Sequence, residues 1–385
     1  MQAADNRVRA AEGSRVTARA FGNPILTYSV DQTPFPGGRP IPDMAREGMT
    51  TATLPLEYLY QRGPRVTRAN AEVRSAEADA GAARQRIALD AAGAYYRVAF
   101  AQVQSATTHD LLGWLDTLVG YNRSRVREGV AAEADLIRSE LERDRVAAEA
   151  SMQDADLAQA RAALGAFVSN SRVTLSLPTV AMSDAPLPVS SPTTIGVRPE
   201  VRAARERVAA SSAAVSAERS MIVRQLGATI GTMQSGGTTS MIAGVSLPLP
   251  LFDQNRGEIQ RASAERDVAA YELAARERSA SADLLGAREA ARILTERATT
   301  LARRDSASFL ARAEEARRIA LGAYREGAVP LFQVIDAARA WADARLTYYK
   351  TMVAQHQSVL ALLVAEGADL FTNAPDPISN GESLR

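Results

Sequence analysis

The chain has 385 residues, and its 45 Lys and Arg balance 44 Asp and Glu to leave a net charge of +1. This balance argues against a nucleic-acid partner, because proteins that bind nucleic acids carry a clustered basic surface. There is no cysteine, which excludes disulfides, thiolate zinc sites and cysteine nucleophiles, and the two histidines show no metal-ligand spacing. No catalytic constellation is visible, so we expect no enzyme activity, no cofactor and no bound metal.

The first part of the chain predicts a short helical segment, two strands and a very long helix. No apolar run approaches the ~18 residues of a membrane-spanning helix, and the first ten residues lack the apolar stretch of a signal peptide. The first strand is expected at residues 25–30. The second is expected at residues 51–60, with an apolar face formed by Ala52, Leu54, Leu56, Tyr58 and Tyr60.

The long helix is expected over the proline-free residues 65–121, which would span about 85 Å. Its apolar residues alternate steps of three and four, which is the repeat of a coiled coil. A turn at Gly129 then leads into a second helix. The seam residues, which fit an ordinary antiparallel coiled coil equally well, are Val66, Ala69, Val73, Ala76, Ala80, Ala83 and Ile87.

The second half repeats this order. Strands are expected at residues 224–233 and 240–251, and a proline-free helix over residues 257–324 precedes a turn at Gly327. The coiled-coil seam of this helix is interrupted once, at Arg278. Its other members are Ala264, Val268, Tyr271, Ala275, Ala282 and Leu285.

Short strings recur in the same order in both halves. Leu-Pro-Leu at residues 54–56 recurs at 247–249, and Arg-Glu-Gly at residues 127–129 recurs at 325–327. These matches indicate an internal duplication. We predict a first repeat at residues 1–177, a linker at 178–199, a second repeat at 200–371 and a polar tail at 372–385.

The expected strands place apolar residues on one face and polar residues on the other. This alternation over about ten residues is typical of strands in a membrane β-barrel. Four strands are too few to close a barrel, and open strand edges are forbidden in lipid. The edges are therefore expected to pair with other copies of the chain. The alternative is a soluble β-layer beside the helices.

The string GVSLPLPLFDQNRGEIQRA at residues 244–262 resembles the strand-to-helix signature of the TolC-like outer-membrane efflux proteins. A weaker copy lies at residues 53–69, and Tyr324 to Gly327 resembles the periplasmic helix turn of that family. The resemblance covers nearly the whole chain and is closest to the metal-efflux branch of CzcC- and CusC-like proteins.

This resemblance implies a mainly α fold with a small β part, namely two repeats of long α-helical hairpins with four strands per chain. In a homotrimer these strands would form a twelve-stranded transmembrane β-barrel in outer-membrane lipid, with the helices extending into the periplasm. The implied function is the exit duct of a tripartite pump in a Gram-negative bacterium, with no enzyme activity. The implied partners are a periplasmic adaptor and an inner-membrane RND-type transporter.

The resemblance has one departure at the N-terminus. The second half opens its first helix at Arg198, Pro199 and Glu200, whereas the first half begins just after the equivalent point. We therefore expect the first helix to be absent or truncated.

The resemblance also assigns roles to residues at the two turns. Gly129 and Gly327 would form tips that dock on the adaptor, with Arg127 and Arg325 as contacts; the alternative is two plain turns. Residues six and nine positions beyond each tip would narrow the periplasmic mouth. The candidates are Asp135, Gln333 and Asp336; the alternative is that both aspartates lie on solvated faces or pair with Arg138 and Arg339.

The transported substrate stays open at this stage. Heavy-metal cations are favoured by the resemblance, and drugs or other small solutes are the alternative. A periplasmic adaptor and a soluble coiled-coil scaffold are the remaining alternatives, because both contain long helical hairpins.

Overall fold

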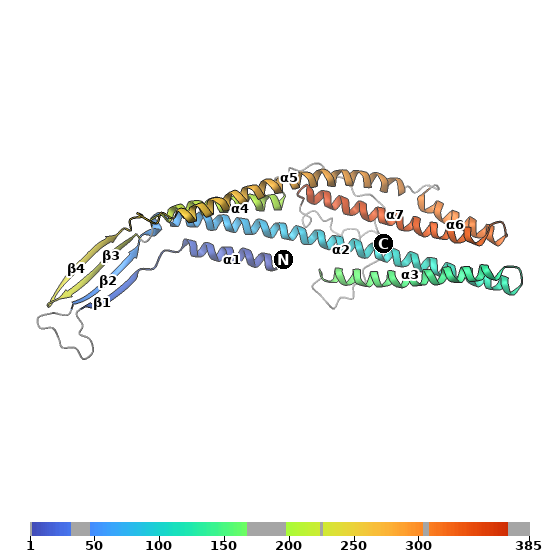
Figure 1. The fold of residues 1–385 in the computed structure, drawn as a ribbon, viewed down its shortest axis with the longest axis horizontal. Helices are drawn as coiled ribbons and strands as arrows, with labels where there is room; N and C mark the ends of the chain where they lie inside the picture. The colour runs from blue at the N-terminus through green and yellow to red at the C-terminus, as the bar shows by residue number, and fades with distance from the viewer. Residues whose placement is uncertain (1, 32–46, 168–197, 224–225, 303–307, 369–385) are drawn as a thin grey trace, which may run out of the picture. The chain divides into compact units, whose positions relative to one another are not determined.

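A computed structural model describes residues 2–31, 47–167, 198–223, 226–302 and 308–368 (Figure 1). Within these ranges the chain is mainly helical, with one small antiparallel sheet. Most of the predicted linker at residues 178–199 and all of the predicted tail at 372–385 lie outside the described residues. The chain divides into two compact units, and each unit takes segments from both halves of the sequence.

The first unit comprises Met1–Arg84 and Gly196–Ala280 and contains the sheet. The strands are β1 (Ile25–Asp31), β2 (Glu47–Pro55), β3 (Gly227–Ser235) and β4 (Thr238–Ser246). They pair in sequence order, each antiparallel to the next. The four predicted strands are therefore confirmed, and β1 and β4 form the two edges.

The register of the sheet brings apolar residues from each of the four strands to one face, although Ile25, Met49, Met233 and Ile242 lie on the other. Leu26 pairs with Ala52, Ala52 pairs with Ile230, and Ile230 pairs with Ala243. Within this chain the face is open, since Leu26 is 75% exposed. The opposite face carries hydroxyl groups, and among them those of Thr53 and Thr229 are 2.9 Å apart. The predicted alternation of polar and apolar faces is thus confirmed.

Two strands end earlier than the sequence predicts. Strand β2 stops at Pro55, and the 3-10 turn η1 (Glu57–Leu59) follows, so Tyr58 and Tyr60 do not belong to the strand. Strand β4 stops at Ser246, before Leu247, Leu249 and Leu251. Proline explains both ends, because residues 55, 248 and 250 have no N–H to donate to a ladder.

The close approach of β2 and β3 depends on Gly231. A Cβ at this position would lie 2.2 Å from the carbonyl oxygen of Thr50 and 2.8 Å from the Cα of Thr51. No side chain fits there without separating the strands. This glycine therefore fixes the spacing in the middle of the sheet.

The first helix was expected to be absent or truncated, and its absence is contradicted by the structure. Helix α1 (Gln2–Arg19) has 18 residues, against 22 in its counterpart α4 (Pro199–Ser220). Neighbouring side chains support α1. Arg65 donates to the carbonyls of Ala18 and Ala20 at 3.0 and 2.8 Å, which satisfies groups that a helix end leaves without partners.

The first long helix forms as predicted, and the second is interrupted. Helix α2 is continuous (Arg62–Arg127), whereas α5 (Arg256–Leu301) ends before α6 (Phe309–Arg325) begins. Ser308 explains the new start, because its hydroxyl accepts a hydrogen bond from the backbone N–H of Ala311 at 3.2 Å. Such an N-cap favours a helix beginning over a helix interior.

The two predicted coiled-coil seams have different outcomes. In the first unit the α2 seam is packed, because Ala69, Val73 and Ala80 are buried. The α5 seam is not packed within the chain. Val268 and Tyr271 are 57% and 78% exposed, and Ala262 and Ala280 are buried on a different stripe of the same helix.

The second unit comprises Gln85–Ile195 and Ser281–Arg385, and its described residues are mainly helical. Its helices include the C-terminal part of α2, α3 (Glu133–Gly165), α6 and α7 (Leu331–Ala365). Buried apolar residues from all four helices share one core, including Leu115, Val146, Tyr324 and Val334. The two predicted turns join the helices that form this core, α2 to α3 and α6 to α7.

Candidate functional site at the helix turns

Each half of the chain joins two long helices through a glycine in the left-handed conformation. The φ angles are +74° at Gly129 and +77° at Gly327. At the first turn the N–H of Gly129 donates to the carbonyl of Val126, and the N–H of Val130 donates to that of Arg125. These two bonds define a Schellman motif, which ends a helix and favours glycine.

The second turn has the same pair of bonds. The N–H of Gly327 donates to the carbonyl of Tyr324 at 3.0 Å, and that of Ala328 donates to Ala323 at 2.8 Å. The predicted turns are therefore both present, and they are built identically. Arg127, Gly129, Arg325 and Gly327 are all exposed, so they are available for an external contact.

Aromatic and polar contacts join the helices just before the two turns. The hydroxyl of Tyr324 donates to Oδ1 of Asn122 at 2.7 Å. The guanidinium of Arg125 lies 5.6 and 5.5 Å from the ring centroids of Tyr121 and Tyr324. Burial and then the charge of Asp135 raise the pKa of Tyr324, so the hydroxyl keeps its proton and donates at neutral pH.

The three gate candidates occupy different positions in this bundle. Asp135 is half-buried in the first turn of α3. A carboxylate at this position interacts favourably with the positive end of the helix dipole. Gln333 and Asp336 are exposed on α7. Asp336 faces a groove of about 670 Å³ between α3 and α7, whose lining includes Arg138 and Arg339.

The same groove contains an ionic centre that sequence reasoning missed. Glu142 of α3 is only 7% exposed. It accepts hydrogen bonds from Arg339 of α7, one of them at 2.8 Å, and from Arg145 at 2.8 and 3.2 Å. Burial alone raises the pKa of Glu142, but the bonds from Arg339 and Arg145 outweigh burial and lower this pKa to about 2.

A signal for this centre exists in the sequence. Glu142 lies three residues after Ser139 and four before Val146, and both are fully buried. A carboxylate at such a position falls on the inner face of the helix. Arg145, three residues further along, marks a charge partner for that carboxylate.

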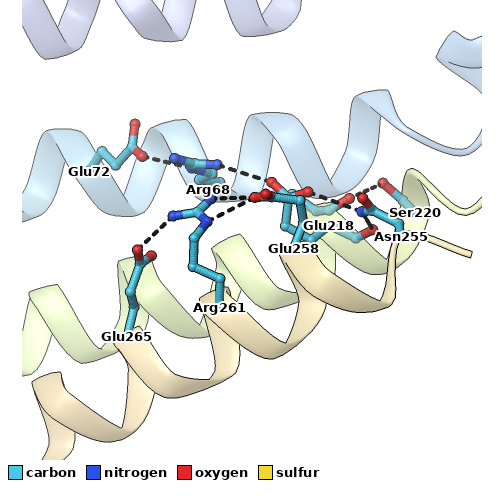
Figure 2. A network of polar contacts seen from close by, with 9 residues as sticks. Arg68, Glu72, Glu218, Ser220, Asn255, Glu258, Arg261 and Glu265 are labelled. Carbon is cyan, nitrogen blue, oxygen red and sulfur yellow. Dashed lines mark hydrogen bonds and ion pairs between the residues drawn. The ribbon is translucent and has the colours of Figure 1, made fainter. Parts of the chain in front are cut away.

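The signature motif forms a cap at the junction of strand and helix in the first unit (Figure 2). Asn255 has φ +55° and is 4% exposed. Its Nδ2 donates to the backbone carbonyl of Glu218 at 2.8 Å and to the Glu218 carboxylate at 3.1 Å. Its N–H donates to Oδ1 of Asp253 at 2.9 Å. The asparagine thus fastens the end of α4 to the start of α5.

Arginines on both sides extend this network, as Figure 2 shows. Arg68 of α2 bonds Glu72 at 2.8 Å and lies 3.9 Å from Glu218. On α5, Arg261 pairs with Glu258 at 2.8 Å and with Glu265 at 2.6 Å. The most specific part of the sequence signature is therefore a structural junction.

The described residues provide no group of three or more His, Cys, Asp or Glu able to hold a metal ion. Among the helices of the described ranges, none is both long enough and apolar enough to cross a membrane.

Comparison with known proteins agrees with this geometry. Residues 193–368 match the sequence model of the family described as "Outer membrane efflux protein". The chain is 31% identical over 276 residues to the nickel and cobalt resistance protein CnrC of Cupriavidus metallidurans, across 68% of this chain and 63% of that protein. It is 25% identical over 376 residues to the cobalt-zinc-cadmium resistance protein CzcC of the same organism, across 94% of this chain and 85% of that protein.

Solved structures share the fold. A crystal structure of CusC matches with a TM-score of 0.79 and 18% identity, across 96% of this chain and 89% of that chain. VceC from Vibrio cholerae matches with a TM-score of 0.75 and 21% identity, across 95% of this chain and 92% of that chain. The antiparallel sheet with long helical hairpins is therefore the fold of outer-membrane channel proteins.

Residues 193–368 therefore form a domain of the outer membrane efflux protein family, and the chain is a homologue of the metal-resistance proteins CnrC and CzcC. It is accordingly an outer-membrane protein of a Gram-negative bacterium. The family assignment confirms the resemblance found in the sequence and decides against the periplasmic adaptor and the soluble scaffold.

Proposed function

We propose that the chain forms the homotrimeric exit duct of a tripartite efflux system. Three copies would contribute four strands each to a twelve-stranded barrel in the outer membrane. Their helices would form a tunnel that receives substrate from a periplasmic adaptor and an inner-membrane RND-type transporter. The duct itself catalyses no reaction, because passage of substrate requires only a continuous tunnel.

The observation that carries this proposal is the pair of open sheet edges. Among the described residues, strands β1 and β4 each have a neighbour on one side only, and the apolar face of the sheet is exposed. In lipid, unpaired backbone groups on such edges have no water to bond. Strands β1 and β4 are the two edges of a four-stranded antiparallel sheet and therefore run in opposite directions. For this reason β4 of one copy can pair antiparallel with β1 of the next.

The exposed seam on α5 supports the same assembly. Ala264, Val268, Tyr271 and Ala275 keep coiled-coil spacing and are all exposed. A seam of this kind is completed by another helix. Within the trimer proposal that helix belongs to the neighbouring copy.

The proposed cargo is heavy-metal cations. The two curated relatives named above carry resistance to nickel and cobalt, and to cobalt, zinc and cadmium, in their names. The runner-up cargo is drugs or other small solutes, since a duct need not bind its substrate closely. Deleting the gene distinguishes the two, because loss of metal resistance with unchanged drug resistance supports the metal route.

We further propose that Asp135, Gln333 and Asp336 line the periplasmic mouth and that the tips at Gly129 and Gly327, with Arg127 and Arg325, contact the adaptor. Three copies would place each carboxylate in a ring, which favours cations. Asp336→Ala is expected to lower the cation preference of single channels in planar bilayers at low salt, where charge is least screened.

A matched control is Glu296→Ala, which removes an exposed carboxylate from α5 instead of α7. Equal effects of the two substitutions on ion selectivity would contradict the gate assignment. Absence of any channel from the wild-type protein would contradict the duct itself.

A further inference from the structure

An imidazole and a carboxylate face each other on the surface of the second unit, where α2 lies beside α3. Nε2 of His109 on α2 is 3.5 Å from Oδ2 of Asp154 on α3. The two side chains are 50% and 51% exposed, so solvent reaches both of them. Neither residue belongs to the turns, to the gate candidates or to the ionic centre around Glu142.

Ser105, one helical turn before His109 on α2, fixes the orientation of the imidazole ring. Nδ1 of His109 lies 2.9 Å from the backbone carbonyl oxygen of Ser105. A carbonyl oxygen can only accept a hydrogen bond, so this contact requires the proton on Nδ1. In the neutral ring the free lone pair is then on Nε2, which is the nitrogen that faces Asp154.

The hydroxyl of the same serine holds the carboxylate. Oγ of Ser105 donates to Oδ1 of Asp154 at 2.7 Å, and Oδ2 is the oxygen that lies near the imidazole. Histidine ligands of metal ions usually donate their other ring N–H to a carbonyl or carboxylate, and carboxylate ligands are themselves hydrogen-bonded. Ser105 provides both of these supporting contacts.

The separation of Nε2 and Oδ2 fits an ion between them better than a direct hydrogen bond. At 3.5 Å it exceeds the usual N–H···O length of about 2.7–3.2 Å. Two ligand atoms that each lie about 2.1 Å from one metal ion, at a tetrahedral angle, are about 3.4 Å apart. A small cation can therefore bind both atoms with little movement of either side chain.

We propose that His109 and Asp154 form a binding site for one divalent transition-metal cation, such as Ni²⁺, Co²⁺ or Zn²⁺. An imidazole nitrogen beside a carboxylate oxygen favours these ions over Mg²⁺ and Ca²⁺, which prefer oxygen ligands. The protein supplies two ligands, and the exposed position lets water complete the coordination. Sequence spacing does not reveal the site, because the two ligands are on different helices.

The site goes beyond the proposed duct, because a single chain binds the ion whether or not three copies assemble. It also has a consequence for the hairpin itself. Unfolding separates α2 from α3 and so destroys the site. A ligand that binds only the folded chain stabilises it, so the bound ion stabilises the pairing of these two helices.

Calorimetric titration of the full chain with NiCl₂ tests the site, on protein in detergent and without a polyhistidine tag. We expect one ion per chain. Because loss of an outer contact already weakens metal binding about tenfold or more, we expect at least that loss from His109→Gln and from Asp154→Asn. Asp156→Asn removes an exposed carboxylate from the same helix and is the matched control, with binding unchanged.

Two results of this titration would overturn the proposal. One is equal Ni²⁺ affinity of the wild type and His109→Gln, which would show that the imidazole is not a ligand. The other is displacement of Ni²⁺ by an equimolar amount of Ca²⁺, which would show that carboxylate charge alone attracts the ion.

Ser105→Ala distinguishes an organised site from two side chains that meet by chance. The substitution removes the hydroxyl that holds Asp154 and keeps the carbonyl that orients His109. We expect it to weaken Ni²⁺ binding about tenfold. Ser151→Ala is the control, because the Ser151 hydroxyl donates to Ala147 within its own helix. Equal affinities of the two serine variants would contradict the orienting role of Ser105.

A second measurement uses the unaltered protein. Diethyl pyrocarbonate modifies unprotonated imidazole nitrogens, and His109 is 50% exposed whereas His356, the other histidine, is 4% exposed. We expect Ni²⁺, and not Ca²⁺, to protect His109 from modification in peptide mass spectrometry. Equal modification with and without Ni²⁺ would overturn the site. Protection in a protein that forms no channel would support the site and contradict only the duct.

Discussion

Replacing Glu142 with glutamine tests the ionic centre between α3 and α7. The substitution keeps the shape of the side chain and removes its charge. Arg339 and Arg145 then face each other without the carboxylate that each of them bonds. We expect Glu142→Gln to destabilise the folded protein, because both arginines lose their ion pair with the buried carboxylate.

The magnitude follows from the pKa of Glu142. This pKa falls from 4.5 to about 2 in the folded protein. A shift of about 2.5 units corresponds to about 3 kcal/mol in the free energy of unfolding. The Glu142 side chain is 8% exposed, but those of Arg145 and Arg339 are 52% and 47% exposed, so solvent screens the pair and about 3 kcal/mol is an upper bound.

The pH dependence has a definite sign. Because the folded pKa is the lower one, the unfolded chain binds the proton more readily. The contribution of Glu142 is therefore fully present above about pH 4.5 and is lost as the pH falls through about 2. The difference between wild type and Glu142→Gln is expected to shrink to about half its neutral value near pH 3.

Urea unfolding followed by the helical circular dichroism signal measures this difference, at fixed protein and detergent concentrations. Glu140→Gln on the same helix is the control. Its partner Arg123 is 2.7 Å away, but both side chains are exposed, so we expect a loss below about 1 kcal/mol. Equal losses from both substitutions, or a difference that does not change between pH 7 and pH 3, would refute the reasoning.

Three further substitutions test the local geometry, two through the same unfolding measurement and one through membrane insertion. Gly327→Ala places a side chain at φ +77° and is expected to cost about 1–2 kcal/mol, whereas Gly322→Ala in open helical space is expected to be neutral or stabilising; a reversed order would contradict the assigned turn. Gly231→Ala is expected to prevent normal pairing of β2 and β3, whereas Gly244→Ala, where an added Cβ has nothing within 4 Å, is expected to be tolerated; equal membrane insertion of both would count against the close approach. Asn255→Gly keeps the positive φ and loses the cap, so it is expected to cost about 1 kcal/mol, and Asn255→Ala is expected to cost more; equal costs would show that φ does not matter there.

The sequence predicts the sheet well because polar and apolar residues alternate along each strand with a period of two residues. The register of Leu26, Ala52, Ile230 and Ala243 follows from that alternation once the strands are paired. It does not predict the strand ends, where proline at residue 55 overrides a pattern that continues to Tyr60. Periodicity describes which face a residue takes, and the loss of an N–H donor decides where pairing stops.

The helical part was harder to predict for a different reason. The glycine turns were visible because φ > 0 selects glycine. Helix α1 was expected only as a short, absent or truncated segment, because its contacts are with residues remote in sequence, such as Arg65 and Arg84 of α2. The hydrogen bonds from Arg339 to Glu142 and from Tyr324 to Asn122 likewise join residues that are far apart in the sequence, and local patterns do not contain that information.

Cross-linking the two sheet edges tests the central claim of a closed trimer most directly. Tyr28→Cys on β1 and Met241→Cys on β4 place thiols on the two edge strands of one chain. Three strand spacings of about 4.8 Å, or about 14 Å in total, separate these edges, so a shorter cross-linker joins only neighbouring copies. We expect covalent dimers and trimers of the 41.1 kDa chain in the outer membrane, with nothing larger. Monomers alone, or a ladder that continues beyond three copies, would contradict it.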